Sequence, residues 1–464
     1  MVSGKGTSKP YIQFIGHSST DVTGSMHLVR FKKYVTLLDC GLVQLNDLLT
    51  NYRANQEQLK KVKPTRVDYI ILTHLHIDHS GLIPAMFARG CHAHVYVPFG
   101  CKKYLRILWE DSMKIMQSDC DKINHKHGLK TAPFYGPEDI DKALTRCIEV
   151  PYYSEYVINT EMTFTYIPAG HIIHSAQVVL TLHQNNIVKR IGYTGDIGGT
   201  LLRRPYTKLR EDLPFVDVLI GENTYNYPTR PNRLLDREKD LEKIATICSQ
   251  ADKILILTFS LGRTQEMLYE LRLLRHNGLI DLPVYLDSPL SQKLCNIWDD
   301  NFFQTVIMTD SSLHQINSWE ESQALQSRKE HCVILSASGF LNGGRALAHL
   351  KTLLPDKRNH VIFCGYSGEN NLASQIKDGD KVVKIDGEWV NNNANITSLY
   401  SFSSHASYEE LMNYYTSLRY NKLCLVHGDN RYKPTFCNIL QDRLVGLGKS
   451  AKVACVNEGT KVYI

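Results

Sequence analysis

The sequence contains no C-x-x-C pair, no long apolar run and no apolar segment near its first residue. Because the 12 cysteines are scattered, they do not indicate a disulfide framework, and we expect small buried side chains in a reducing compartment. The longest apolar runs, such as "ILILTF" at 254–259, are too short to cross a bilayer, and "MVSGKGTSKP" has no signal-peptide core. These absences predict a soluble, intracellular protein with no membrane partner, cytoplasmic or, in a eukaryote, nuclear.

The composition is that of an ordinary globular protein. Of the 464 residues, 43% are hydrophobic and 22% are charged, which is enough apolar material for large cores. The length predicts two or three structural units, or one domain that carries a large insertion. A formal net charge of +6 is compatible with an acidic ligand such as nucleic acid but does not require one.

Short apolar runs separated by turns open the chain and predict strands. "VDYIILT" at 67–73 is nearly continuous, as expected for a strand buried on both faces, and "KYLRILWEDSMKIM" at 103–116 predicts a helix. The segment "HLHIDHSG" at 74–81 directly follows the strand at 67–73. It therefore lies at the carboxyl edge of a sheet, where open α/β folds usually bind ligands.

The character of the chain changes twice. After about residue 225, strands such as "KILILTF" alternate with helices such as "GRTQEMLYELRLLR", which predicts a second, largely parallel sheet. After about residue 394 the pattern of the first segment returns, with "LYSFSSHAS" and "KLCLVHGD". We therefore predict an outer domain formed by residues 1–225 and 394–464, interrupted by an inserted domain at 226–393.

Three histidines and an aspartate within six residues predict a metal site. His74 and His76 are two residues apart, and alternate side chains of an extended segment point the same way, so both can reach one ion. Asp78 and His79 point elsewhere and can bind a second ion. Zinc accepts imidazole nitrogen and carboxylate oxygen, and a catalytic zinc keeps one position open for water. An isolated histidine is usually a hydrogen-bonded core residue, whereas this cluster is a specific signal.

Each ion still needs ligands from elsewhere in the chain. His171 in "PAGHIIHSA", Asp196 in "GYTGDIGG" and His427 in "CLVHGDN" follow other predicted strands and are candidates. A carboxylate between two ions can bridge them, and Asp196 suits that position. Asp39, at the end of "VTLLDCG", is better placed to orient a ligand or the water than to bind an ion.

The order of these motifs resembles that of the metallo-β-lactamase superfamily, through "LLDCG", "THLHIDHSG", "AGHIIHSA" and "YTGD". The remainder resembles its β-CASP branch, whose members cut RNA and DNA, through "GENTY", "FSLGRTQEML", "DSPLS", "SASGFLNGGRALAHL", "FSSHAS" and "LVHGD". The resemblance runs from residue 22 to about residue 429. It implies an α/β fold: an αββα metallo-β-lactamase sandwich with an inserted β-CASP domain of mainly parallel sheet.

The resemblance also implies the roles of the site residues. Two zinc ions are expected as cofactors, with Asp196 bound to both. The remaining ligands are His74, His76 and His171 for one ion, and Asp78, His79 and His427 for the other. His405 corresponds to the catalytic histidine and Glu222 to the acidic residue that supports it. Asp78 and Asp39 are expected to take part in catalysis through the metal centre.

Such a site can run phosphodiester hydrolysis. Two adjacent metal ions can activate a water and stabilise an in-line displacement at phosphorus. The leaving ribose oxygen needs a proton, and histidine, which titrates near neutral pH, can supply it as a general acid from position 405.

A phosphate-binding segment is expected in the inserted domain. Gly343, Gly344 and Arg345 open a predicted helix, whose amides and guanidinium group can bind a phosphate. Ser336 and Ser338 add hydroxyl groups nearby. A Gly-Gly-Arg sequence alone is weak evidence, because most such pairs only form a turn.

Two segments depart from the family pattern. Ser407 stands where the motif around His405 usually has aspartate, and residues 365–379 lack the usual arginine. Every expected metal ligand is nevertheless present, which argues against an inactive scaffold.

The predicted function is that of a zinc-dependent ribonuclease acting on single-stranded RNA. The resemblance implies histidine at this position in RNA enzymes and valine in DNA enzymes, so His427 favours RNA. A DNA-directed nuclease of the same branch is the first alternative. The second alternative is a non-catalytic zinc-binding subunit of an RNA-processing complex. Only about 35 residues follow His427, which leaves no room for an extra C-terminal domain and favours an endonuclease over a 5′-exonuclease. A homodimer or an RNA-processing partner is compatible with the sequence.

Overall fold

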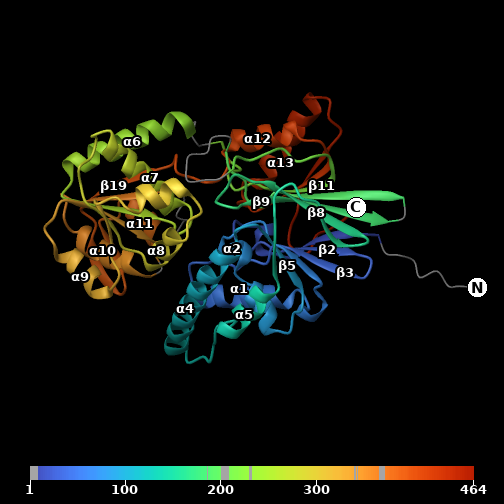
Figure 1. Cartoon of the computed structure of the whole chain (residues 1–464), viewed down its shortest axis with the longest axis horizontal. Coiled ribbons are helices and arrows are strands. Elements are labelled where there is room, and N and C mark those ends of the chain that lie inside the picture. The colour runs from blue at the N-terminus through green and yellow to red at the C-terminus, as the bar shows by residue number, and fades with distance from the viewer. Residues whose placement is uncertain are drawn as a thin grey trace, which may run out of the picture. The chain divides into compact units, whose positions relative to one another are not determined.

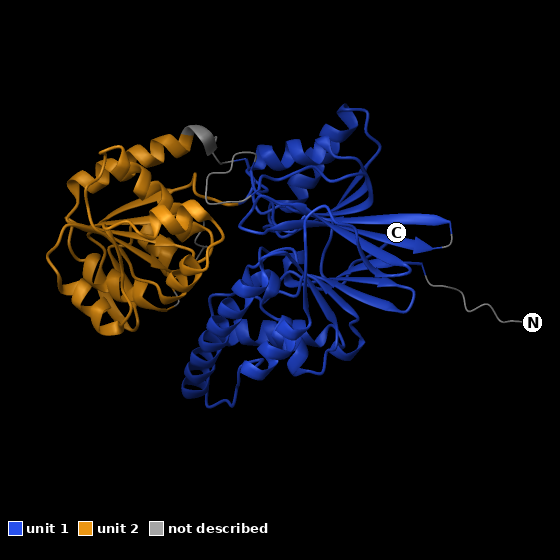
Figure 2. Cartoon of the chain, in the orientation of Figure 1, with its two compact units in different colours: residues 1–202, 208–230, 405–464 blue, residues 203–207, 231–404 orange. Residues whose placement is uncertain are grey.

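The computed structural model of the chain describes residues 9–184, 186–199, 208–228, 233–338, 341, 343–364 and 371–464. These residues form two compact units, which Figure 2 colours separately. The first unit contains the described residues before 200 together with 208–228 and 405–464, and the second contains those between 233 and 404. The first unit is therefore built from segments that precede and follow the second.

The first unit contains two seven-stranded sheets. The strands of one sheet are, in spatial order, β22 (Lys461–Tyr463), β1 (Tyr11–Phe14), β2 (His27–Phe31), β3 (Tyr34–Leu38), β4 (Tyr69–Ile71), β5 (His94–Pro98) and β6 (Cys147–Val150). Pairing is antiparallel from β22 to β3 and parallel from β3 to β6. The carboxyl ends of β3, β4, β5 and β6 therefore share one edge of the sheet.

The second sheet of this unit joins strands from both parts of the chain. Its strands are, in spatial order, β21 (Lys452–Cys455), β20 (Tyr420–Val426), β11 (Val216–Glu222), β10 (Ile187–Tyr193), β9 (Ala176–Gln184), β8 (Met162–Pro168) and β7 (Tyr156–Asn159). β10, β11, β20 and β21 are parallel, whereas β7 to β10 pair antiparallel. The strand before Glu222 thus lies beside the strand before His427.

Helices cover the outer face of each sheet (Figure 1). The first sheet carries α1 (Leu48–Lys60), α4 (Lys102–His127) and α5 (Pro137–Thr145), and the second carries α12 (Tyr408–Ser417) and α13 (Lys433–Gly446). The short helices α2 (Ile77–Ser80) and α3 (Ile83–Ala88) connect β4 to β5. Leu411 of α12 and Leu440 of α13 join a buried cluster with Leu423 of β20. The layers follow the order helix, sheet, sheet, helix, which confirms the predicted αββα sandwich.

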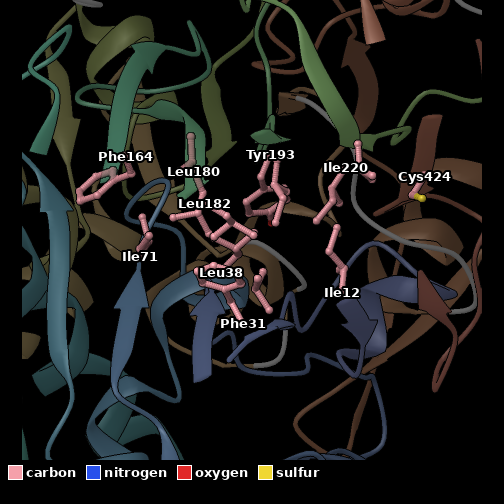
Figure 3. Close-up of a cluster of buried hydrophobic side chains, with 14 of the residues drawn as sticks. Ile12, Phe31, Leu38, Ile71, Phe164, Leu180, Leu182, Tyr193, Ile220 and Cys424 are labelled. Atoms are coloured by element: carbon pink, nitrogen blue, oxygen red, sulfur yellow. The ribbon is translucent and has the colours of Figure 1, made fainter. Parts of the chain in front are cut away.

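The main core of the first unit lies between its two sheets (Figure 3). Leu38 and Ile71 of the first sheet face Phe164 and Leu180 of the second, and all four side chains are fully buried. Burial of each large apolar side chain contributes roughly 1.5–3 kcal/mol. This layer therefore fixes the two sheets against each other and positions the polar loops at their edges.

One histidine in this core has no polar partner. His27 is fully buried, packs edge-on against Phe14 and Tyr193, and has no hydrogen-bond partner at either ring nitrogen. Burial lowers the pKa of His27 to about 3. Because the unfolded chain binds this proton below about pH 6.5 and the folded chain does not, stability is lost as the pH falls from 6.5 towards 3.

We therefore expect His27→Phe to remove part of the acid sensitivity. Between pH 7 and pH 5, the free energy of unfolding should fall by about 2 kcal/mol more in the wild type than in the variant. Denaturant titrations of both metal-free proteins at the two pH values measure this difference, because groups that do not interact with His27 titrate alike in both. An equal loss in both proteins would show that His27 is protonated in the native state.

The second unit is a single parallel sheet with helices around it. Its strands are, in spatial order, β14 (Leu313–Gln315), β13 (Val284–Leu286), β15 (Cys332–Ala337), β12 (Lys253–Thr258), β16 (His360–Cys364) and β19 (Asn395–Leu399). The helices are α6 (Arg233–Gln250), α7 (Arg263–His276), α8 (Pro289–Asn296), η3 (Phe303–Ile307), α9 (Trp319–Ser327), α10 (Arg345–Leu353) and α11 (Leu372–Asp378). A hairpin of β17 (Val382–Ile385) and β18 (Glu388–Asn391) completes the unit. The mainly parallel sheet was predicted and is confirmed.

The boundaries of two features differ from the sequence prediction. The chain rejoins the first unit at His405 and not at residue 394, because β19 pairs with β16 in the sheet of the second unit. α4 continues to His127 although the periodic pattern predicted an end at 116, because Cys120 and Ile123 extend its buried face. In the described part of the chain, no helix combines the length and apolarity needed to cross a bilayer.

The cysteine prediction is wrong for one pair. Cys437 of α13 and Cys455 of β21 form a disulfide bond across 18 residues of sequence. The other cysteines are free and buried, as predicted. The pair escaped prediction because α13 and β21 become neighbours only when the second sheet forms.

Candidate metal centre

Metal-capable side chains gather at the carboxyl edge of the parallel strands. β4 ends at Ile71, and the chain then runs without helical structure through His74 to His76. α2 begins directly afterwards, so Asp78 and His79 belong to its single turn. This change from loop to helix turns the two pairs of side chains in different directions.

Three imidazole rings meet in the first cluster. His76 Nδ1 lies 3.2 Å from His74 Nε2 and 3.1 Å from His171 Nε2. Asp196 Oδ2 lies 3.6 Å from both His74 Nε2 and His171 Nε2. The four potential ligand atoms are all within 4.8 Å of one another, which is compatible with binding to one ion.

The second cluster shares Asp196 with the first. Asp196 Oδ1 lies 3.2 Å from His79 Nε2 and 3.5 Å from His427 Nδ1. Asp78 Oδ2 lies 3.3 Å from His427 Nε2. The structure thus brings together every residue that the sequence nominated as a ligand, and places the two oxygens of one carboxylate towards two separate groups of ligands.

Asp39 stands behind this cluster and does not belong to it. Its Oδ2 atom lies 2.7 Å from His79 Nδ1 and accepts hydrogen bonds from the hydroxyl groups of Thr73 and Tyr193, both at 2.8 Å. Its Oδ1 atom accepts a bond from the amide of Thr73 at 2.7 Å. Asp39 occupies Nδ1 of His79, and Nε2 of this ring faces Asp196, so the orienting role of Asp39 fits this geometry and stays a prediction.

The charges of the cluster residues suit a bound cation. Burial holds the pKa of His74 well below its usual value and lowers the pKa of His76 to about 4, so both rings are neutral and offer lone pairs. Burial also opposes ionisation of Asp196, but His427 and His79 outweigh it and hold its pKa well below the usual value. Burial opposes protonation of His79, yet Asp196 and Asp78 raise its pKa well above the usual value. In the second cluster the proton on His79 therefore balances the negative charge of the carboxylates, and a bound metal cation would take over that role.

The donor set fits divalent metal ions. Asp196 Oδ1 is buried and has no hydrogen-bond donor in suitable geometry, although His79 Nε2 is close. A buried carboxylate oxygen in that condition is costly unless a cation binds it. Imidazole nitrogens together with carboxylate oxygens are the ligands that zinc accepts, whereas magnesium and calcium prefer oxygen alone.

The loop that carries His427 is fixed by a buried lysine. His427 has a left-handed backbone (φ 53°), and its amide donates to Ser18 O at 2.6 Å. Lys433 is fully buried and donates to the carbonyl oxygens of Ser19 and Val456. Burial lowers the pKa of Lys433 to about 8, which leaves the amine mostly protonated at neutral pH. Lys433 thus ties the start of α13 to the segment of Ser18 and Ser19, which accepts the hydrogen bond from the His427 amide.

A further histidine faces the same carboxylate. His405 Nδ1 lies 3.2 Å from Glu222 Oε1, and His405 Nε2 lies 4.0 Å from Asp196 Oδ2. Glu222 is held in turn by the amides of Ile197 at 2.8 Å and Thr224 at 3.0 Å. Glu222 is buried whereas 18% of the His405 side chain is exposed, so a substrate can reach the ring while its carboxylate partner stays protected.

Ser407 does not replace the missing aspartate near His405. Its hydroxyl group accepts from the amide of Glu410, and its own amide donates to the Glu410 carboxylate at 2.9 Å. Ser407 therefore forms the capping box of α12. In the other divergent segment, residues 365–370 lie outside the described residues, and Asn371 caps α11.

The residues expected to bind phosphate all belong to the second unit. Arg345 donates from Nη1 to Asp287 Oδ1 at 2.6 Å and to Ile316 O at 2.7 Å, and Ser336 is buried and donates to Asp287 O at 2.8 Å. Ser338 donates to Gly343 O at 3.4 Å. At Gly343 and Gly344 a Cβ atom would meet nothing within 4 Å, so the start of α10 is open. Arg345 and Ser336 therefore already have structural partners.

Several supporting residues were not predicted from the sequence. Thr224 Oγ1 lies 3.0 Å from His427 Nδ1, and the hydroxyl of Tyr415 donates to Glu222 O at 2.5 Å. Tyr193 and Lys433 act as described above. Thr224 was detectable, because it lies in "GENTY", but no local signal identified Tyr415 or Lys433.

Three family models match the chain. The metallo-β-lactamase superfamily model covers residues 19–115, the Beta-Casp domain model covers 264–376, and the model of the Zn-dependent metallo-hydrolase RNA specificity domain covers 389–451. A solved structure of a protein of unknown function from Enterococcus faecalis V583 has a TM-score of 0.56 at 14% identity, covers 98% of this chain and is itself covered completely, which supports the fold alone.

Curated relatives match nearly the whole chain. Ribonuclease TTHA0252 of Thermus thermophilus is 31% identical over 448 residues, which cover 93% of this chain and 94% of the relative. An RNase J-like protein of Methanocaldococcus jannaschii is 28% identical, with 87% and 89% covered, and transcription termination factor FttA of the same organism is 28% identical, with 90% and 67% covered. The site and fold define a metal-dependent hydrolase. The chain belongs to the β-CASP branch of the metallo-β-lactamase superfamily, as the sequence motifs predicted.

Proposed function

We propose that the chain is a ribonuclease that cuts within single-stranded RNA and uses two zinc ions. The observation that carries this proposal is the position of Asp196, which belongs to both metal-capable clusters and to a third group with Glu222 and His405. Asp196 thus belongs to both candidate metal sites and also faces His405. Relatives named as a ribonuclease and as an RNase J-like protein support RNA as the substrate.

The cluster residues hold the reacting centre in place. Divalent ions held by these residues would make a water more acidic and would supply positive charge for the phosphoryl oxygens. The carboxylates of Asp78 and Asp196 provide the negative charge that retains cations, and the neutral rings of His74 and His76 provide nitrogen ligands. Asp39 keeps His79 in the orientation that directs Nε2 inward.

His405 completes the reaction as the general acid. When the oxygen of water bonds to phosphorus, the bond from phosphorus to the leaving ribose oxygen breaks, and that oxygen needs a proton. Nε2 of His405 faces the clusters and donates this proton, while Nδ1 donates a hydrogen bond to Glu222. The proton from water passes to solvent, and solvent reprotonates His405, which is partly exposed.

Two other functions make different predictions for the same protein. A DNA-directed nuclease would cut DNA of matched sequence at least as fast as RNA. A non-catalytic subunit would bind zinc at the clusters and cut neither nucleic acid. The imidazole-rich donor set favours zinc over magnesium in all three cases.

The deciding assay uses zinc-loaded protein with single-stranded RNA and DNA of the same sequence, each labelled at one end. We expect internal RNA fragments to accumulate, and DNA to be cut at least about tenfold more slowly. Fragments that shorten progressively from one end would show that the protein is an exonuclease and not an endonuclease. A failure to cut either strand would favour the non-catalytic alternative.

A further inference from the structure

Two exposed aromatic side chains follow the strands next to the metal centre. β4 leads to His74, and the two strands beyond it in the sheet, β5 and β6, lead to Phe99 and Tyr153. Phe99 is 63% exposed and Tyr153 is 49% exposed. Because β4, β5 and β6 are parallel, the segments that carry His74, Phe99 and Tyr153 all leave the sheet at the same edge. The segment after β6 then reaches the second sheet, where Tyr152 pairs with Tyr166 of β8.

The turn at Phe99 packs against the loop that holds His171. A Cβ atom on Gly100 would lie 2.5 Å from the imidazole of His174, so the backbone after Phe99 lies directly on that ring. His174 follows His171 by three residues in the same loop. Phe99 therefore projects from a turn that is braced by the loop of a proposed ligand.

The segment of Tyr153 braces the other end of the same loop. The hydroxyl of Tyr152 donates to Ser175 O at 3.0 Å. The hydroxyl oxygen of Ser175 accepts the amide of His171 at 3.0 Å. The turns that carry Phe99 and Tyr153 thus both contact the loop that holds His171.

Tyr153 is held in an unfavourable backbone conformation by several contacts. Its φ is 64°, a region that bulky side chains rarely adopt. Its amide donates to Tyr166 O at 2.9 Å, and its hydroxyl donates to Glu211 Oε1 at 2.5 Å. The amine of Lys208 lies 5.1 Å from the ring centroid. The ring is therefore fixed, exposed and adjacent to a cation.

We propose that Phe99 and Tyr153 form a stacking platform for unpaired bases of the RNA strand that enters the metal centre, which rests on the proposed ribonuclease function. Exposed aromatic faces stack on any nucleobase, and Lys208 adds a cation for a backbone phosphate. Lys208 lies beside the Tyr153 ring, whereas Glu211 contacts only the hydroxyl group at its edge, and the net charge of +6 suits a polyanionic strand better than an apolar partner. Bases of a duplex are already paired and stacked, so the platform selects single-stranded RNA.

The test is the steady-state kinetics of RNA cleavage by Phe99→Ala, Tyr153→Ala and the double variant. Loss of each ring should raise KM by about five- to a hundredfold and leave kcat unchanged, because the rings bind bases and do not touch the reacting phosphate. Tyr463→Ala is the matched control, since Tyr463 is 61% exposed on β22, the strand at the opposite end of the same sheet. An unchanged KM in the double variant overturns the proposal.

Two further variants separate stacking from simple apolar contact. Phe99→Trp should keep the wild-type KM, whereas Phe99→Leu, which retains apolar surface without an aromatic face, should behave like alanine. The wild type should bind RNA with abasic sites more weakly than normal RNA. The double variant should bind the two RNAs equally. Equal rescue by leucine and tryptophan contradicts stacking.

RNA binding is measured separately from cleavage, so that the two proposals can fail independently. Fluorescence anisotropy of labelled RNA with wild type and double variant tests the platform even if no RNA is cut. Cleavage with an unchanged KM in the double variant would refute the platform and leave the ribonuclease function intact. If the wild type cuts no RNA but binds it more tightly than the double variant does, the platform is supported and the proposed ribonuclease function is refuted.

Discussion

Asp196→Ala should release metal from both clusters and reduce RNA cleavage by about a thousandfold or more. This carboxylate places one oxygen 3.6 Å from His74 and His171 and the other 3.2 Å from His79. Residues that only orient metal ligands already change metal affinity by about 10- to 100-fold, so a ligand shared by two ions should change it more. The lost ions also supply several kcal/mol of transition-state stabilisation, which corresponds to about a thousandfold or more in rate.

Elemental analysis after dialysis against graded chelator measures this loss. The wild type should retain close to two zinc ions per chain, and Asp196→Ala should retain less than one. Asp217→Ala is the matched control, because Asp217 lies in β11 of the same unit and pairs with Lys189 at 2.7 Å, outside both clusters. Wild-type retention of both ions by Asp196→Ala would contradict the shared-ligand assignment.

His405→Ala should abolish most cleavage and leave the metals in place. Its Nδ1 atom is bound to Glu222, and Nε2 is the atom that faces the clusters, 4.0 Å from Asp196. Loss of a general acid typically costs about 10²- to 10⁴-fold in rate. Zinc content should equal that of the wild type, because the proposed ligands of both ions lie elsewhere.

A substrate with a better leaving group distinguishes proton donation from a structural role. If sulfur replaces the bridging oxygen that leaves, departure needs little protonation, and His405→Ala should cut this substrate almost as fast as the wild type does. His125→Ala, which removes an exposed histidine from α4, should leave both rates unchanged. An equal defect on both substrates would show that His405 does not act as the acid.

The core of the candidate site could be predicted because its signal is local. His74, His76, Asp78 and His79 follow one buried strand, and the structure needs only a loop and one helical turn to direct them at two clusters. Asp39 was also predictable, since it ends a neighbouring strand of the same sheet. Because the end of a strand lies at a known edge of the sheet, the residues that follow it can be placed from the sequence.

The rest of the site depends on contacts that no local pattern encodes. His427 reaches Asp78 across 349 residues, and Lys433 reaches Ser19 across 414 residues. The family resemblance supplied His427, but Lys433 carries no motif. Its role depends on the packing of α13 against the segment of Ser19, which is far away in the sequence.

In the second unit, a distant contact engages a residue that the sequence pattern suggested was available for a ligand. The segment "GGR" was correctly predicted to open a helix, which is α10, and Arg345 was expected to be available for phosphate. In the structure Asp287, 58 residues away in sequence, binds the Arg345 guanidinium. A local pattern can predict the helix, but it cannot predict which distant carboxylate will neutralise the arginine.

Titration of metal-free protein with zinc, with bound ions and cut RNA counted in the same samples, tests the central claim most directly. We expect no cleavage with chelator present, little after the first equivalent, and full cleavage when the second equivalent is bound. Full cleavage at one equivalent, or cleavage in chelator, would contradict a two-ion site joined by Asp196.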